Sequence, residues 1–207
     1  MRAWIYDRMF HHLSRDWYRF IVNALPEGTR LLDVGVGTGT SLLSQVSLLR
    51  SRSIQVQGID INAQYLKACQ AKIDQLNAHD LIQVREESIY NLDAPNQFDA
   101  VYFSASFMLL PDQREALRVV KQNLGEGGLI CFTQTFEKKR ARLMELIKPL
   151  LYMVTTVHFG VVTYEEPFLK MLEEEGLEVV TNELLHDQGS REMRAVIASV
   201  KAERDLS

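Results

Sequence analysis

Short apolar runs alternate with segments of helical period along most of this chain. Apolar runs typical of buried strands span 30–34, 54–60, 81–89, 98–104 and 129–134. Helical patterns follow four of these runs, at 38–50, 62–78, 112–124 and from 136 onward. Strands followed by helices predict a parallel sheet with right-handed crossovers. Two last strands, 177–184 and 192–200, flank a polar turn and predict a terminal hairpin that adds an antiparallel strand. We therefore expect an α/β fold with a doubly wound sheet.

The first apolar run leads directly into a glycine-rich turn. It ends in Asp33, and glycines then occupy every second position, at Gly35, Gly37 and Gly39. Glycine lets the backbone approach a ligand closely and accepts positive φ, and the amides that open the next helix point at whatever lies over the turn. A dinucleotide fingerprint would need a further glycine where Thr40 stands, and a Walker loop would need Gly-Lys-Ser/Thr. The turn predicts a nucleotide-type cofactor other than NAD.

The pattern apolar-apolar-acid-apolar-Gly-x-Gly-x-Gly at 31–39 resembles the first motif of the class I S-adenosylmethionine (SAM) methyltransferases. The segment 98–101 resembles the Phe-Asp-apolar-apolar motif of the same family. The Tyr-Asp pair at 6–7, followed by the aromatic segment 17–20, resembles the quinone-biosynthesis C-methyltransferases. The resemblance implies a Rossmann-like sheet of seven strands in the order 3-2-1-4-5-7-6, with strand seven antiparallel, and SAM at the carboxyl ends of strands one and four.

Several residues after the strands are expected to contact the cofactor. Asp60 lies 21 residues after Gly39, close to the distance at which a strand-end carboxylate meets a ribose, and one carboxylate can accept from two hydroxyls. The resemblance implies that Ile61 packs on the adenine, and that Glu87, or its neighbour Glu86, meets the adenine amino group. The full set of expected cofactor contacts is Asp33, Gly35, Gly37, Gly39, Thr40, Asp60, Ile61, Glu87, Ser88, Ile89 and Ser104.

Two parts of the chain are expected to flank a methyltransferase domain at 29–207. Residues 1–28 are rich in aromatic side chains and predict a helical extension, either a lid that closes on the site or a helix packed on the flank. The segment 136–162 predicts an insertion on the acceptor side. Its apolar face and its basic start predict a cap over the acceptor, a contact of 138–154 with a membrane surface, or a helix whose charges simply face water.

Methyl transfer from SAM requires little covalent chemistry from the protein. Methyl transfer from a sulfonium is an in-line displacement with an activated donor, so alignment and exclusion of water matter most. The catalytic group is left open, with Tyr6, Tyr18, His11 and His158 as candidates. A metal site is not expected, because His11 and His12 lack partners at suitable spacing.

The acceptor is predicted from the apolar stretches around the expected site. The loop 107–110, the apolar face of 146–154 and the aromatic N-terminus predict an enclosure for a small molecule that is partly apolar, quinol-like or lipid-like. A small polar amine or thiol is the alternative, because an apolar wall also excludes water. A non-catalytic subunit that binds SAM and regulates another chain is a further alternative, against which the intact cofactor motifs argue.

Charge and composition exclude other classes of partner. The net charge is −4, and the basic residues cluster only at 138–142, so nucleic acid is not an expected partner. The N-terminus is too polar for a signal peptide, and apolar runs fall short of the roughly 18 residues of a membrane span. Two cysteines make neither a disulfide framework nor a metal-ligand pattern. We expect a cytoplasmic enzyme; its oligomeric state is not predicted.

Overall fold

A computed structural model describes residues 3–138 and 163–201, with side chains from residue 14 onward. Within these residues, seven strands form one sheet in the order β3-β2-β1-β4-β5-β7-β6. The strands are β1 (Arg30–Val34), β2 (Gln55–Asp60), β3 (Ile82–Glu86), β4 (Phe98–Ser104), β5 (Leu124–Glu137), β6 (Leu177–Asp187) and β7 (Arg191–Val200). β7 runs antiparallel to both of its neighbours, while β1 to β5 are parallel. The predicted order and the reversed seventh strand are confirmed.

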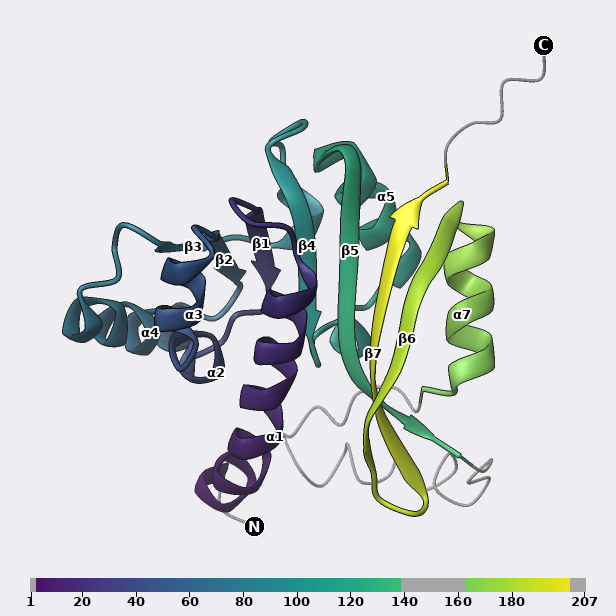
Figure 1. Ribbon diagram of the computed structural model, residues 1–207, viewed down its shortest axis with the longest axis horizontal. Helices are drawn as coiled ribbons and strands as arrows, with labels where there is room; N and C mark the ends of the chain where they lie inside the picture. Colours follow the sequence, from purple (N-terminus) through teal and green to yellow (C-terminus); the bar gives the residue numbers. More distant parts are fainter. Residues whose placement is uncertain (1–2, 139–162, 202–207) are drawn as a thin grey trace.

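Helices cover both faces of this sheet (Figure 1). On one face lie α1 (Ala3–Ala24), α2 (Thr40–Leu43), α3 (Val46–Ser51) and α4 (Ala63–Leu76). On the other lie α5 (Gln113–Asn123), α7 (Glu165–Glu174) and the short 3₁₀ helices η1 (Ile89–Asn91) and η2 (Phe107–Leu109). Successive residues of β1, Leu31 and Leu32, are fully buried in these two separate cores. A strand buried on both faces needs a continuous apolar run, which is why β1 can be read from the sequence.

Capping residues define the two long helices that follow the predicted strands. Asn62 precedes α4, and its side chain accepts from the backbone N–H of Gln64 and Tyr65. Asn77 ends that helix in the left-handed conformation, with φ 48. Asp112 caps α5 by accepting from Glu115 N at 2.9 Å. These local signals place both helices within a residue or two of the expected bounds.

Three local expectations were wrong. The helix expected at 38–50 is divided into two short helices, with Ser44 and Gln45 between them. The side-chain amide of Gln45 donates to the hydroxyl of Ser44 and to the backbone carbonyl of Arg15. The strand expected at 129–134 begins earlier, at Leu124, so the glycines at 125–128 belong to β5, whose register against β4 shifts between Phe98 and Ala100. The sequence at 163–166 has the Thr-x-x-Glu pattern of a capping box with Thr163 as the N-cap, but α7 begins one residue later than this pattern predicts. The N-cap residue is Tyr164, which makes no side-chain cap hydrogen bond.

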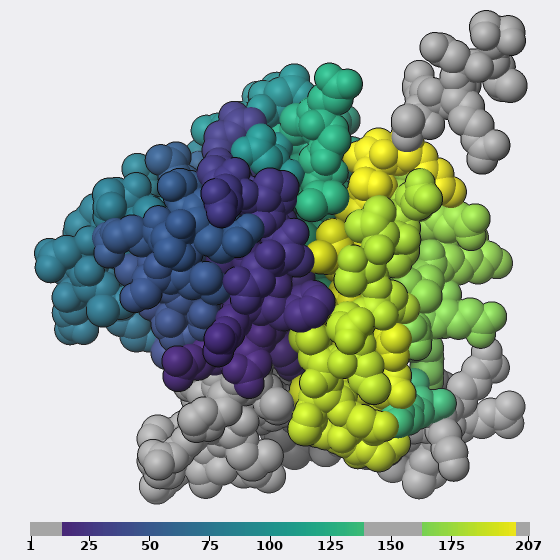
Figure 2. Space-filling view, viewed as in Figure 1, coloured from purple at the N-terminus to yellow at the C-terminus, as the bar shows by residue number. Residues whose placement is uncertain are grey.

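The second half of α1 is part of the core. Trp17, Tyr18, Ile21 and Val22 are each at most 3% exposed. Figure 2 shows this part of α1 beside the hairpin of β6 and β7 on the face in view. From residue 14 onward, α1 is therefore a packed flank helix, whereas closure of residues 1–28 over the site stays a prediction.

The predicted acceptor-side insertion lies mostly outside the described residues. This holds for 139–162, including His158 and the apolar face of 146–154. The first cation of the basic cluster, Lys138, forms ion pairs with Asp187 at 2.7 Å and with Glu192 at 3.1 Å. Its charge is thus compensated within the domain. Among the described helices, each is too short or too polar to span a bilayer.

Candidate cofactor site

The expected cofactor residues gather at the carboxyl ends of β1, β2, β3 and β4. The chain passes from β1 to β2 on one side and returns to β4 on the other, so β1 and β4 form the switch point of the sheet. The glycine turn leaves β1 there and is held to β2 by two hydrogen bonds, because Gly35 N and Val36 N both donate to the carbonyl of Ile59, at 2.8 and 3.1 Å. Gly35, Gly37 and Gly39 all have positive φ.

The three glycines of the turn serve two different purposes. A Cβ on Gly35 would lie 2.7 Å from Cβ of Ser106, and one on Gly39 would lie 2.3 Å from Sγ of Cys69. These two positions must therefore be glycine for the turn to pack on the loop after β4 and on α4. A Cβ on Gly37 would meet nothing within 4 Å. Gly37 borders open space, as a residue that lies under a ligand should.

Asp60 joins the second strand to the glycine turn. Its Oδ2 accepts from Gly37 N, and its Oδ1 accepts from Asn62 N, both at 2.8 Å. A carboxylate oxygen has more than one acceptor site, so both oxygens can still accept from ligand hydroxyls. The two backbone bonds fix the carboxylate before any ligand arrives, which suits the expected ribose contact.

Lys72 was missed by the sequence analysis. From α4 its Nζ donates to the carbonyl of Thr38 at 3.0 Å and contacts Oγ1 of Thr40. The hydroxyls of Thr38 and Thr40 are themselves 2.9 Å apart. Thr40, expected to contact the cofactor, thus ties the glycine turn to α4. The only signal in the sequence is the position of Lys72 one helical turn after buried Cys69, which does not identify its partner.

Asp33 and Tyr18 form a buried pair beside the turn. Asp33 is 0% exposed, and the hydroxyl of Tyr18 donates to its Oδ2 at 2.7 Å. Within the described part of the chain, Asp33 Oδ1 has no hydrogen-bond partner. Burial raises the pKa of Asp33 to about 7, the bond from Tyr18 lowers it, and the charge of Asp60 raises it. Burial also raises the pKa of Tyr18. The hydroxyl of this candidate catalytic residue therefore stays protonated and donates to Asp33, so it does not act as a base in this arrangement.

The expected adenine side combines an apolar and an acidic residue. Ile61, directly after Asp60, is 75% exposed. Glu87 is partly buried, and its backbone N–H donates to the carbonyl of Asp60 at 3.1 Å, whereas Glu86 is exposed. The Glu87 carboxylate faces the guanidinium of Arg85 at 2.5 Å. Of the two rival acids, Glu87 is the more buried; its contact with the adenine stays a prediction.

The remaining expected contacts have mainly structural roles in this conformation. Ser88 caps η1 by accepting from Tyr90 N at 3.4 Å, and Ile89 is buried in the core. Ser104 ends β4 and is half-buried. A residue that sequence reasoning missed, Ser106, donates from its hydroxyl to the carbonyl of Val34 at 2.5 Å. This bond holds the loop after β4 against the glycine turn.

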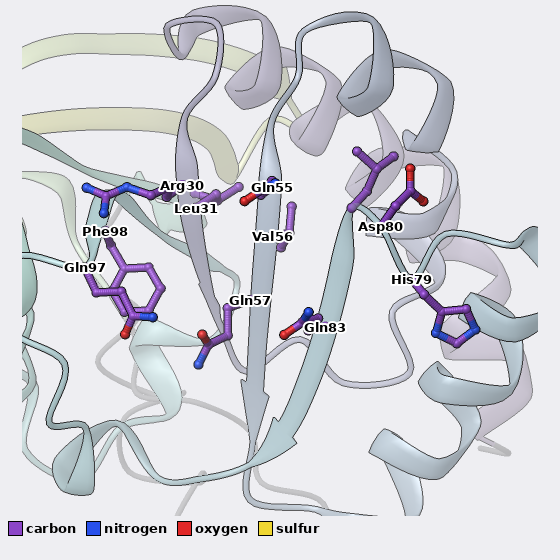
Figure 3. A pocket seen from close by; sticks show the side chains of 11 residues that line it. Arg30, Leu31, Gln55, Val56, Gln57, His79, Asp80, Gln83, Gln97 and Phe98 are labelled. Atoms are coloured by element: carbon purple, nitrogen blue, oxygen red, sulfur yellow. The ribbon is translucent and has the colours of Figure 1, made fainter.

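A hollow of about 200 Å³ lies at the opposite edge of the sheet from the candidate cofactor site (Figure 3). Its lining comes from the amino ends of the strands, as with Arg30, Gln55 and Phe98. Arg30 is bound to Asp99 there, with Nη2 and Oδ1 2.7 Å apart. Ligands of doubly wound sheets bind at the carboxyl ends. We therefore do not assign this hollow to the cofactor.

The residues at the carboxyl edge fit SAM. Gly37 borders open space, Asp60 offers a fixed carboxylate, and Ile61 offers an exposed apolar side chain next to it. Asp33 keeps one buried oxygen without a protein donor among the described residues. Residues 31–128 also match the model of the family described as methyltransferase domain. The chain therefore carries a methyltransferase domain at 31–128 and is a SAM-dependent methyltransferase.

Known relatives of this methyltransferase act on different acceptors. This chain is 27% identical over 157 residues to phosphatidylethanolamine N-methyltransferase of Cereibacter sphaeroides. The matched region covers 74% of each of the two chains. This chain is 28% identical over 152 residues to demethylmenaquinone methyltransferase of Lactiplantibacillus plantarum, covering 70% of this chain and 62%, less than two thirds, of that one.

Solved structures share its fold. One is geranyl diphosphate C-methyltransferase from Streptomyces coelicolor in complex with geranyl diphosphate and S-adenosyl-L-homocysteine. The TM-score is 0.72 at 14% identity, over 92% of this chain and 81% of that one. At this identity the likeness establishes the fold alone.

Proposed function

We propose that this methyltransferase transfers the methyl group of SAM to a small, partly apolar acceptor that is quinol-like or lipid-like. The observation that carries the proposal is the loop after β4. Residues 104–111 contain no titratable side chain, and Leu109 is 53% exposed at the carboxyl edge of the sheet. An apolar wall with few polar groups suits an acceptor with a large hydrophobic part. Two relatives whose names specify a phospholipid and a quinone support the same class.

A cluster of buried phenylalanine rings packs against this loop on the core side. Phe107 of η2 packs edge-on against Phe103 at 5.1 Å and Phe132 at 5.0 Å between ring centroids. Phe168 of α7 adds a further edge-on contact to Phe132 at 5.2 Å. The packed rings fix the backbone that carries Met108 and Leu109. A rigid apolar support of this kind aligns an acceptor and keeps water away from the reacting atoms.

The described residues act on the reaction by binding and orientation. When bound, SAM supplies a methyl group activated by its sulfonium, so the S–CH₃ bond breaks as the acceptor–CH₃ bond forms. Asp60 and Gly37 hold the cofactor end of the site, and Ser106 fixes the acceptor loop against it. A general base is needed only for an acceptor that arrives protonated. Its candidates Tyr6, His11 and His158 lie outside the described side chains and stay predictions.

A labelled-methyl assay with the isolated protein tests the proposal. Radiolabelled SAM is supplied with demethylmenaquinol in detergent, with phosphatidylethanolamine vesicles, or with soluble phenols, amines and thiols. We expect label in the organic extract from one of the first two. The Gly37→Val variant, in which a side chain fills the open space, is the matched negative control.

Other results would overturn the proposal. Label found only on a soluble, charged amine or thiol would favour the alternative acceptor class. Cofactor binding without transfer to any acceptor would favour a non-catalytic SAM-binding subunit. Sedimentation of the protein with the vesicles tests the proposed membrane contact of 138–154 separately, and loss of sedimentation in Lys139→Glu with Arg140→Glu is the expected result.

A further inference from the structure

We propose that Tyr18 is a positioning residue of the cofactor site. Its hydroxyl, carried on α1, holds Oδ2 of Asp33 and leaves Oδ1 for a hydrogen-bond donor of bound SAM. The pair lies next to the glycine turn, since Asp33 is two residues before Gly35. The inference rests on the cofactor assignment and is independent of the acceptor proposed above.

One oxygen of the Asp33 carboxylate has no hydrogen-bond partner among the described residues. The carboxylate is fully buried, and its other oxygen accepts from the Tyr18 hydroxyl. A buried acceptor without a donor is costly, so such an atom in a functional site calls for an explanation. SAM and S-adenosylhomocysteine both carry an ammonium group in their amino-acid part, which is a cation and a donor. Ionised Asp33 should favour this group, and protonated Asp33 should not.

Tyr18 can hold Asp33 because its own ring is fixed. Its ring meets that of Tyr102 edge-on, with centroids 4.9 Å apart and planes at 82°. The hydroxyls of Tyr102 and Thr133 are in turn 2.7 Å apart. Tyr18 is 3% exposed, and its neighbours Ile21 and Val22 on α1 are fully buried. The Tyr18 hydroxyl therefore has a fixed place, and the position of α1 is coupled directly to the acid of the first strand.

The groups around Asp33 determine the sign of the expected pH dependence. Tyr18 from α1, Tyr102 from β4, Asp60 from β2 and Cys69 from α4 interact electrostatically with Asp33, and Lys72 of α4 interacts with Cys69. Besides burial, the charge of Asp60 raises the pKa of Asp33, whereas the hydrogen bond from Tyr18 lowers it. Removing the Tyr18 hydroxyl should therefore raise this pKa further, and cofactor affinity should recover only at higher pH.

Calorimetric titration of S-adenosylhomocysteine, from about pH 6 to about pH 8.5, tests the proposal without any acceptor. Wild-type affinity should rise with pH across this range. In Tyr18→Phe the same rise should occur at higher pH, and affinity at neutral pH should be lower by about tenfold if the rise moves by about one pH unit. Tyr102→Phe is the matched control, because it removes a buried hydroxyl that pairs with Thr133 and not with Asp33, while it keeps the ring that packs on Tyr18. Its binding curve should keep the wild-type pH dependence.

A second variant covers the case in which Tyr18→Phe does not fold. Asp33→Asn keeps an acceptor for Tyr18 and removes the titrating group, so its affinity should be weaker and independent of pH over the same range. Tyr18 has a merely structural role if Tyr18→Phe melts at a lower temperature but keeps the wild-type binding curve. A wild-type pH dependence in Asp33→Asn, or no binding by the wild-type protein, would also overturn the inference. Failure of methyl transfer to every acceptor would leave it standing.

Discussion

The backbone N–H of Gly37 donates to Oδ2 of Asp60 at 2.8 Å, which makes the glycine turn and the acid of the second strand a single unit. The other oxygen of Asp60 accepts from Asn62 N, the N-cap residue of α4. One carboxylate thus fixes the turn after β1 and the start of the helix after β2. The cofactor site is built from these backbone bonds, and a change at Asp60 affects both binding and loop geometry.

Replacing Asp60 by Ala should reduce the affinity for S-adenosylhomocysteine by about 1.5–3 kcal/mol, because it removes a charged acceptor from the ligand hydroxyls. Asp60→Asn is the control, since its amide oxygen can still accept from Gly37 N. This control should lose less affinity than Asp60→Ala. Isothermal calorimetry measures both, and an unchanged affinity in Asp60→Ala would refute the ribose assignment.

The glycines of the turn should respond differently to the same substitution. Gly37→Ala places its Cβ in open space, so it should impair cofactor binding while costing about 1–2 kcal/mol of stability for the positive φ. Gly39→Ala carries the same backbone cost and also a collision with Sγ of Cys69. It should therefore unfold at a lower temperature than Gly37→Ala.

The double variant Gly39→Ala with Cys69→Ala separates collision from backbone strain. Removing the sulfur should restore part of the lost melting temperature, because the atom nearest the new Cβ is gone. Thermal unfolding of the wild type, Gly39→Ala, Cys69→Ala and the double variant gives the coupling energy between positions 39 and 69. Purely additive losses would mean that the sulfur does not limit the space at Gly39.

Lys72 should stabilise the glycine turn from α4. In Lys72→Met the turn loses two contacts, to the carbonyl of Thr38 and the hydroxyl of Thr40. We expect the free energy of unfolding to fall by about 0.5–1.5 kcal/mol for each bond and cofactor affinity to fall several-fold. Denaturant unfolding and calorimetry are the measurements. Lys67→Met, on the exposed side of the same helix, is the control and should change neither.

Asp33 should make the stability of the cofactor-free protein depend on pH. Burial raises its pKa in the folded state to about 7, above the ordinary value of 3.8. Its contribution is therefore fully present below the unfolded pKa and is lost as the pH rises through about 7. The free energy of unfolding of the wild type, minus that of Asp33→Asn, should fall by roughly 2–4 kcal/mol between about pH 4 and pH 8. A flat difference would mean that Asp33 is ionised throughout.

The sequence predicts the positions of candidate site residues correctly where these residues follow directly on a strand. Asp33, the glycines and Asp60 lie at the ends of apolar runs, so periodicity and spacing alone bring them to the carboxyl edge of the sheet. The contacts that the sequence analysis missed join residues far apart in the chain. Ser106 is 72 residues from Val34, and Lys72 is 32 residues from Thr40. Neither pairing leaves a periodic signal, because each depends on how whole elements pack.

The broken helix after the glycine turn shows the same limit in a local element. Apolar residues continue at helical spacing through 40–51, so the pattern predicts one helix. The structure divides it at Gln45, whose side chain donates to the carbonyl of Arg15 on α1. This tertiary hydrogen bond joins residues 30 positions apart, so the local pattern of apolar residues carries no sign of it.

The proposed closure of the N-terminal extension leads to the last prediction. Trp17, Tyr18 and Ile21 are buried without any ligand, so the second half of α1 should be protected from hydrogen exchange in every state. A lid, if it forms, must come from the first half, which carries Tyr6 and His11. Exchange with and without S-adenosylhomocysteine should show cofactor-dependent protection confined to residues 3–13. Equal protection of that half in both states would make the whole of α1 a flank helix, and the acceptor enclosure would then have to come from 107–110 and 139–162.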